Sequence, residues 1–223
     1  MSEVWRREVD TKMKEYHKIN TIFKRDLTTK KILVGQYSTP EIEYLANCEW
    51  RFDEKIDGTN IRVMWTRESG VRFGGKTDHA QIYVPLIDRL NQIFSSDKFI
   101  EAFNGDPPES ACLYGEGYGA RIQKGGGNYI PDGVDFILFD IRVGDWWLKR
   151  EDVCDIANKL GLRVVPEVGF GTLSTAIDVV MDGLKSKFGD FEAEGIVARP
   201  ILELKSRNGH RIITKIKGRD FKK

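Results

Sequence analysis

The 223-residue sequence has only three cysteines, and they lie far apart. Cys48, Cys112 and Cys154 form no C-x-x-C pair and have no pair of histidines nearby. This spacing argues against a structural zinc site and against a disulfide framework. We therefore expect a reducing compartment and take the cytoplasm as the default location, either that of the protein's own cell or, for a viral protein, that of the host.

Long hydrophobic runs, charge of one sign and repeats are also missing. No apolar segment approaches the ~20 residues that span a bilayer, so we expect no membrane association. The first residues, MSEVWRREVDTKMKEYHK, are charged and contain no secretory-type apolar stretch. Lys+Arg 35 against Asp+Glu 34 gives a net charge of +1. Any basic surface for nucleic acid must therefore be a local patch.

Strand-type patterns dominate the segment 31–75 and recur in the middle and at the end of the chain. The segments with this pattern are KILVGQY, EWRFDEKI, NIRVMWTR, VRFGG, ACLYGEGYG, DFILFDIRV, EGIVARP and HRIITKIKG. Between NIRVMWTR and VRFGG the sequence Glu68-Ser69-Gly70, with alternating residues on both sides, predicts a hairpin.

Helical patterns are fewer. The polar first thirty residues are compatible with an amphipathic helix, and residues 78–104 carry apolar side chains at helical spacing. Two more helices are predicted at about 151–160, ending at Gly161, and at about 175–187, ending at Gly189. The last of these is expected to bury Ile177, Val180, Met181 and Leu184. Strands in antiparallel-looking groups with helices between them predict a single α+β domain over residues 1–223, with antiparallel sheets flanked by helices.

Residues 52–60, FDEKIDGTN, contain the most informative position, Lys55. It lies among Asp53, Glu54 and Asp57, just ahead of a Gly-Thr-Asn turn and between two strand-like segments. A lysine held at the end of a strand and partly desolvated can act as a nucleophile. An exposed lysine in an ion-paired hairpin is the alternative, and this segment alone favours that simpler arrangement.

A phosphate-binding loop is a competing hypothesis. Residues 70–77, GVRFGGKT, match G-x-x-x-x-G-K-[ST], and FILFD ends in Asp140 like a strand whose aspartate helps hold magnesium. That mechanism needs a strand, a loop and then a helix whose N-terminus faces the phosphates. Here Gly70 lies in the predicted hairpin turn and Val71-Arg72-Phe73 alternate as a returning strand. We expect extended backbone there, and an NTPase that uses Lys76 stays as an alternative.

A second set of motifs covers most of the chain in a fixed order. It consists of Lys55-x-Asp57-Gly58 with Asn60, Gly75-Lys76-Thr77, Tyr114-Gly115-Glu116-Gly117, Phe136 to Asp140, Glu194-Gly195-Ile196-Val197 with Arg199, and Lys215-Ile216-Lys217. Each motif alone also fits an ordinary loop, core or solvated strand. Lys215 and Lys217 alternate along a strand, however, so both project from one face and suit a polyphosphate. Glu194 begins an apolar strand, where a carboxylate is costly unless a cation pairs with it.

This ordered set resembles the covalent nucleotidyltransferases, the superfamily of ATP-dependent ligases and mRNA capping enzymes. The form EKIDGTN most resembles the RNA ligase 2 family, and KINTIFKRD is similar to a segment ahead of the nucleophile in some RNA ligases. The resemblance runs from about residue 16 to 217 and implies the nucleotidyltransferase (ATP-grasp-like) fold of a ligase catalytic domain. Because the chain ends six residues after Lys217, we expect no C-terminal OB-fold or helical domain.

The resemblance implies a role for each matching residue. Lys55 attacks the α-phosphorus of ATP and carries AMP, while Lys215 and Lys217 contact the α-phosphate and orient the leaving pyrophosphate. The other residues expected to contact ATP or AMP are Glu54 and Phe139 at adenine, Glu116 at the ribose, and Asn60, Lys76, Glu194 and Arg199.

Metal and nucleic-acid contacts are implied in the same way. Glu194 and Asp57 are expected to hold Mg²⁺ or Mn²⁺, and Asp57 and Asn60 to act once the nucleic-acid end is engaged. Lys76 stands where ligases usually carry an arginine, so Arg72 is a further candidate for the 5′-phosphate, because lysine lacks the bidentate guanidinium fork. Asp140, next to Phe139, is one more candidate.

The resulting prediction is an ATP-dependent RNA ligase, a monomer acting in RNA repair. It transfers AMP from ATP to Lys55, then to an RNA 5′-phosphate, and a 3′-hydroxyl finally displaces the AMP. A minimal DNA ligase would share the first step, because the choice depends on contacts with 2′-hydroxyls and on helix form. A noncatalytic nucleic-acid-binding module is the last alternative, and it would form no ATP-dependent adduct.

Overall fold

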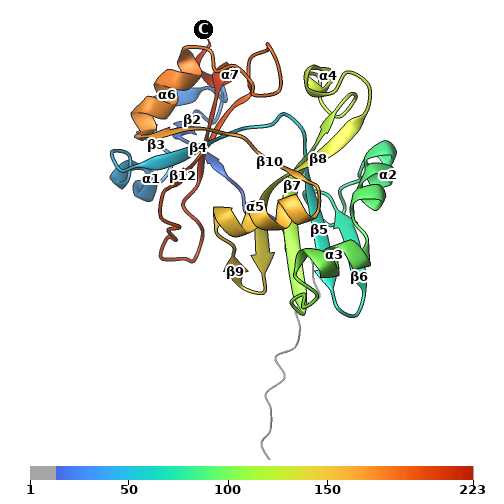
Figure 1. Cartoon of the computed structure of the whole chain (residues 1–223). Coiled ribbons are helices and arrows are strands. Elements are labelled where there is room, and N and C mark those ends of the chain that lie inside the picture. Colours follow the sequence, from blue (N-terminus) through green and yellow to red (C-terminus); the bar gives the residue numbers. More distant parts are fainter. Residues whose placement is uncertain (1–13, 223) are drawn as a thin grey trace, which may run out of the picture. The chain divides into compact units, whose positions relative to one another are not determined.

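A computed structural model describes residues 14–222 (Figure 1). The chain forms two compact units that alternate along the sequence. Within the described residues, unit 1 contains 14–16 and 58–164, and unit 2 contains 17–57 and 165–222. The single domain predicted over residues 1–223 therefore comprises two compact units, and its folding as one domain stays a prediction.

Unit 1 is built on a six-stranded sheet in which β10, β8, β7, β5 and β6 follow one another and β9 pairs with β8. The strands are β5 (Thr59–Thr66), β6 (Gly70–Gly74), β7 (Ser110–Gly119), β8 (Val134–Val143), β9 (Trp146–Trp147) and β10 (Arg163–Val164). All pairs are antiparallel except β10 with β8. The predicted hairpin is confirmed, since β5 and β6 pair with Thr66 opposite Gly70.

Helices cover one face of this sheet. They are α2 (Val84–Ile93), α3 (Ser96–Ala102) and α5 (Arg150–Lys159), whereas the short α4 (Gly126–Tyr129) lies against the end of β7 at Gly119. Ile61, Val63 and Trp65 alternate along β5 and pack in one hydrophobic core with side chains of α2, α3 and α5. Alternate residues of a strand point to opposite faces, so the intervening positions of β5, such as Asn60 and Arg62, face the other way.

Unit 2 contains a five-stranded sheet in the order β1, β13, β12, β4, β11, and a separate β2–β3 pair. The strands are β1 (Asn20–Thr21), β2 (Phe23–Arg25), β3 (Ile32–Tyr37), β4 (Trp50–Glu54), β11 (Glu167–Gly171), β12 (Gly195–Pro200) and β13 (Thr214–Lys217). The helices are α1 (Pro40–Tyr44), α6 (Leu173–Met181) and α7 (Gly218–Phe221). The edge strand β1 runs parallel to β13, and the other pairs are antiparallel.

Period-two alternation also separates the two faces of this sheet. Trp50 and Phe52 of β4, with Ile196 and Ile216 of the neighbouring strands, pack in one core with α6 (Figure 1). Residues between these positions project from the opposite face. They are Arg51, Asp53, Val197, Arg199, Lys215 and Lys217. One face of the sheet thus packs on the hydrophobic core, and the opposite face carries most of the polar and charged side chains.

The predicted strands are all present, and the helical pattern over residues 78–104 is confirmed by two helices, α2 and α3. Two other helix predictions need correction. The helix expected over 175–187 ends at Met181, because Gly183 takes a left-handed φ of 87°. Met181 is consequently 60% exposed instead of buried.

The second correction concerns the N-terminal segment. Residues 1–13 lie outside the described residues, so the helix predicted there is untested. From residue 14 to 30 the chain contains strands β1 and β2 and no helix. Among the described residues no helix is long and apolar enough to cross a bilayer.

Candidate active site

Lys55 directly follows β4, and the backbone of β12 fixes its position. Its backbone N–H donates to the carbonyl of Gly195 at 2.9 Å. Its Nζ lies 2.6 Å from Oε2 of Glu194, and Nζ of Lys217 lies 2.6 Å from Oε1 of the same carboxylate. One carboxylate therefore holds two ammonium groups, with all three side chains partly buried.

Charge at this cluster is tightly balanced. Burial acts to raise the pKa of Glu194, but the ammonium groups of Lys55 and Lys217 outweigh it and hold that pKa below its ordinary value. Burial raises the pKa of Asp57, and the nearby charge of Glu194 raises it further. The positive charges of Lys55 and Lys217 oppose both effects at Asp57, so these two lysines act on both carboxyl groups of the cluster.

Glycine is required where β12 meets β13. Gly195 pairs with Lys217 and has a φ of 149°, a region that favours glycine. A Cβ at this position would lie 2.0 Å from the carbonyl oxygen of Ile216. The close approach keeps Glu194 within reach of Lys217, and the β13 register leaves Lys215 half-buried on the same face as Lys217.

Glu54 has a different environment from its neighbour Lys55. It is 1% exposed, and its carboxylate accepts hydrogen bonds from the Ser186 hydroxyl at 2.6 Å and the Lys187 backbone N–H at 2.9 Å. These bonds anchor the segment that follows α6. The adenine contact predicted for Glu54 stays a prediction, and these contacts give it no support.

Arg199 lies on the polar face of the same sheet. Its Nε is 3.7 Å from Oδ2 of Asp53, which also accepts from Nη2 of Arg51 at 3.2 Å. Arg199 is 7% exposed and Asp53 is 1% exposed. Within unit 2, Asp53 is thus an internal partner for two arginines, a role that the sequence did not reveal. The predicted phosphate contact of Arg199 stays untested.

In unit 1, Asn60 and Glu116 lie directly opposite each other on β5 and β7, so their side chains share one face. The Asn60 Oδ1 atom is buried and accepts no hydrogen bond from any residue that the structure describes. Gly58 precedes them, and a Cβ there would lie 2.2 Å from the carbonyl oxygen of Gly117. Only glycine allows this turn to approach β7 so closely.

Phe139 and Asp140 belong to an aromatic cluster in unit 1. The Tyr16 hydroxyl donates to Oδ2 of Asp140 at 2.5 Å, and its ring meets Phe139 edge-on with centroids 5.1 Å apart. Tyr114 and Trp147 complete the cluster, with ring centroids 5.2 and 5.6 Å from that of Tyr16. Phe139 remains half-buried.

The phosphate-loop hypothesis is wrong. Gly70–Gly74 is strand β6, and no helix follows Lys76 until α2 begins at Val84. Lys76 and Arg72 are both exposed, with Lys76 beyond the end of β6 and Arg72 within it. The strand backbone is committed to pairing with β5 and cannot cradle phosphates.

Comparison with known families separates the remaining interpretations. The profile of the family described as RNA ligase matches residues 48–217, well over half of the chain. The chain belongs to the RNA ligase family. No sequence among the curated proteins matches it significantly.

Solved structures of Naegleria gruberi RNA ligase share the fold of this family member. One mutant with ATP and Mn is 19% identical with a TM-score of 0.59, covering 80% of this chain and 52% of that chain. A second mutant with ATP and Mn is 19% identical with a TM-score of 0.61, covering 90% and 60%. The complex with PPi is 20% identical with a TM-score of 0.59, covering 91% and 61%. The predicted α+β ligase fold is confirmed, and the chain spans about half to three-fifths of these relatives.

Two structural features of this RNA ligase family member were not predicted from its sequence. Arg62 is fully buried, and it donates from Nε to the Gly75 carbonyl at 2.7 Å and from Nη2 to Asp78 at 2.9 Å. An arginine inside the apolar stretch NIRVMWT was the available signal. The second is Asp53, whose pairing with Arg199 depends on a strand neighbour far away in sequence.

A metal cage made only of side chains is absent from the described part of this RNA ligase family member. No group of three or more described His, Cys, Asp or Glu side chains is placed to hold a metal ion. A magnesium-type ion commonly uses one or two carboxylates and completes its shell with substrate phosphates and water. Glu194 and Asp57 stay the predicted carboxylates for this role, and the charge of Glu194 acts on the Asp57 carboxyl.

Proposed function

We propose that this chain is an ATP-dependent RNA ligase that carries AMP on Lys55. The observation that supports this function best is the Lys55–Glu194–Lys217 cluster, with both Nζ–Oε distances at 2.6 Å. It joins a partly desolvated lysine, a carboxylate and a second lysine on the sheet face opposite the core. A surface ion pair would need neither the buried strand pairing nor the glycine at position 195.

In the proposed first step, the Lys55 amine attacks the α-phosphorus of ATP. A nitrogen–phosphorus bond forms, the bond from that phosphorus to the bridging oxygen breaks, and pyrophosphate leaves. An ammonium group has no lone pair for this attack, so Lys55 must first release Glu194 and lose a proton. Lys217 and its strand neighbour Lys215 then face the negative charge of the phosphates.

Glu194 and Asp57 are the proposed ligands of Mg²⁺ or Mn²⁺. The Naegleria gruberi relatives were solved with ATP and Mn, which supports both as substrate and cofactor here. The bound ion would neutralise phosphate charge in the transition state. Glu194 would hold this ion together with Asp57, and the ion would supply positive charge to the Glu194 carboxylate in place of the Lys55 ammonium.

Residues of unit 1 complete the proposed substrate contacts. Phe139 and Glu116 would contact adenine and ribose, and the open Oδ1 acceptor of Asn60 supports a ligand there. Lys76 and Arg72 would engage the 5′-phosphate end. In the later steps this phosphate takes AMP from Lys55, and the 3′-hydroxyl of the second strand displaces AMP. We further propose a cytoplasmic monomer that acts in RNA repair.

Adduct formation tests the nucleophile. Wild type and variants are incubated with ATP labelled at the α-phosphate and magnesium, and the denatured protein is examined for retained label. We expect Lys55→Ala to lose the adduct, because the proposal makes the Lys55 amine the attacking group. Lys31→Ala, an exposed lysine of the same unit, is the matched control and should keep the adduct. An undiminished adduct in Lys55→Ala would overturn the assignment.

A chase then tests the acceptor. The adenylylated protein is mixed with nicked RNA or nicked DNA duplexes, and sealed product is measured on denaturing gels. Sealing of RNA is expected, since the chain belongs to the RNA ligase family. Sealing of DNA alone would make the chain a minimal DNA ligase with the same nucleophile.

A further inference from the structure

A groove in unit 2 runs beside the two lysines of β13. It has a volume of about 710 Å³ and is bordered by the segment from Lys18 to Arg25 and by β13. We call it the basic groove. Its lining residues that carry charge are Lys18, Lys24, Arg25, Lys215, Lys217 and Arg219.

The charge of the basic groove is all of one sign. Among the residues that the structure describes, no aspartate or glutamate lines it. Arg25 is paired with Asp220 at 2.5 Å, and Lys217 is paired with Glu194. Lys18, Lys24 and Arg219 form no salt bridge with any residue in the described part of the chain. In a protein of net charge +1, this local excess of cations calls for an anionic ligand.

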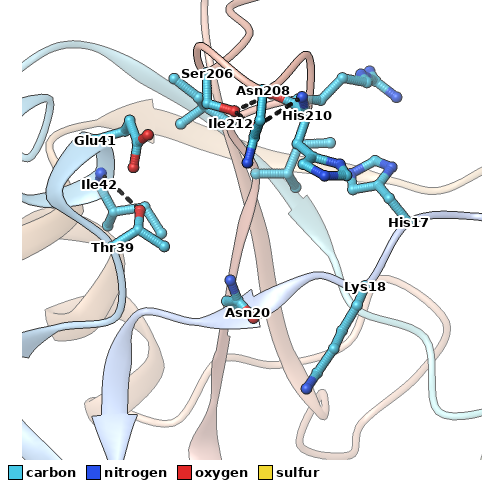
Figure 2. Close-up of a pocket in the computed structure, with 12 residues that line it drawn as sticks. His17, Lys18, Asn20, Thr39, Glu41, Ile42, Ser206, Asn208, His210 and Ile212 are labelled. Carbon is cyan, nitrogen blue, oxygen red and sulfur yellow. Dashed lines mark hydrogen bonds between the residues drawn. The ribbon is translucent and has the colours of Figure 1, made fainter.

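A second pocket adjoins the groove. It has a volume of about 370 Å³, and Lys18 and Asn20 line both cavities. Figure 2 shows His17 and His210 on one side of this pocket and Asn208 above Asn20. Its lining carries amide and imidazole groups with one carboxylate, that of Glu41. Such a cavity is large enough for one small polar unit such as a nucleoside.

We propose that the basic groove binds the phosphate backbone of a single RNA strand, which passes Lys18 and places a nucleoside in the adjoining pocket. This inference rests on the proposed function. A nucleoside triphosphate carries its negative charge at one end only, whereas a nucleic-acid strand carries a negative phosphate at every nucleotide. The cations extend from Lys217 as far as Lys18, where a second, less charged cavity begins. A nucleic-acid strand matches this arrangement, because its repeated phosphates fit the line of cations and one nucleoside fits the adjoining pocket.

Salt-dependent binding tests the groove. A short labelled single-stranded RNA is titrated without ATP into wild type, Lys18→Ala, Lys24→Ala and the double variant at several salt concentrations. Each lysine that contacts a phosphate should lower the slope of log Kobs against log salt by about 0.7. The double variant should bind several-fold more weakly. Lys31→Ala is the matched control, because Lys31 is exposed in the same unit and lines neither cavity.

Adduct formation separates this inference from the proposed function. The double variant should form the AMP adduct at the wild-type ATP dependence, and its thermal midpoint should match that of Lys31→Ala. Unchanged RNA affinity and salt slope in the double variant would overturn the inference. A raised ATP requirement with unchanged RNA binding would also overturn it and assign the groove to the triphosphate. A wild type without any adduct refutes the catalytic proposal alone, since RNA binding is measured without ATP.

Discussion

Glu194 is the residue on which the charge of the cluster depends. Its carboxylate lies 2.6 Å from the ammonium groups of both Lys55 and Lys217, so removing its charge breaks both ion pairs at once. Neither the sequence spacing nor the apolar strand that follows showed that a single carboxylate serves both lysines. The pairing depends on the register between β12 and β13, which is a tertiary feature.

Titration of Glu194 should be visible in the stability of the protein. Its pKa is lowered from the ordinary 4.5 in the fold. The ionised group therefore stabilises the fold above pH 4.5, and this contribution disappears as the pH falls through the lowered value. We expect Glu194→Gln to lose that part of the acid dependence, measured without divalent metal as the free energy of unfolding in urea from neutral pH down to well below pH 4.5.

Asp190→Asn is the matched control for this measurement. Asp190 also has a lowered pKa, caused by Lys185, but it is fully exposed. Exposed pairs contribute little, so its substitution should leave the pH profile nearly unchanged. A Glu194→Gln profile that runs parallel to wild type would show that the carboxylate is not held as the structure indicates.

At the scale of elements, alternation along strands explains what could be predicted. The spacing of Lys215 and Lys217 placed both on one face, and β13 confirms this with Ile216 buried between them. The same rule predicted the β5–β6 hairpin and argued against a phosphate loop. Helix ends were harder to predict, because α6 ends near Gly183 and the sequence offers a second glycine, Gly189, a few residues later.

Arg62 of strand β5 holds the segment that follows the neighbouring strand β6. Its guanidinium bonds to Gly75 and Asp78 fix the segment after β6 that carries Lys76. Lysine has no planar fork and can keep only part of these bonds. We expect Arg62→Lys to destabilise the protein by about 1.5–3 kcal/mol, the range for hydrogen bonds to charged groups. Urea unfolding measures the loss, and hydrogen exchange should rise in residues 75–78.

Asp78→Ala provides the comparison for Arg62. Asp78 is half-exposed and supplies one of the two bonds, whereas the Gly75 carbonyl bond remains. Its substitution should therefore cost less than Arg62→Lys. Equal losses would mean that the ion pair, and not the backbone bond, holds this segment.

For the whole molecule, the pairing of strands that lie far apart in the chain could not be predicted from the sequence. Local patterns indicate strands, but they do not show that β4 pairs with β11 and β12, from the opposite end of the chain. Unit 2 is consequently assembled from two segments, with all of residues 58–164 inserted between them. The motifs suggested a common function because their order along the chain matches that of a family. The distances between their side chains could not be inferred from the sequence.

This insertion couples the stabilities of the two units through chain entropy. Within unit 1, β5, β7, β8 and β10 are successive neighbours, so the ends of the insertion lie about three strand spacings, or roughly 15 Å, apart. An unfolded insertion of about a hundred residues would raise the cost of closing unit 2 by up to about 4 kcal/mol. Folded unit 1 removes most of that cost.

A core substitution in unit 1 should therefore weaken unit 2 as well. Leu90 of α2 is fully buried in the unit 1 core, and Leu90→Ala should cost about 2–5 kcal/mol there. Hydrogen exchange in increasing urea, followed separately for β7 and for β12, should show both units losing protection in one transition that shifts together in the variant. Tyr44→Ala, an 87% exposed site on α1, is the control and should shift neither. If β12 kept its midpoint in Leu90→Ala while β7 lost its own, the two units would fold independently, and the prediction of a single domain over residues 1–223 would fail.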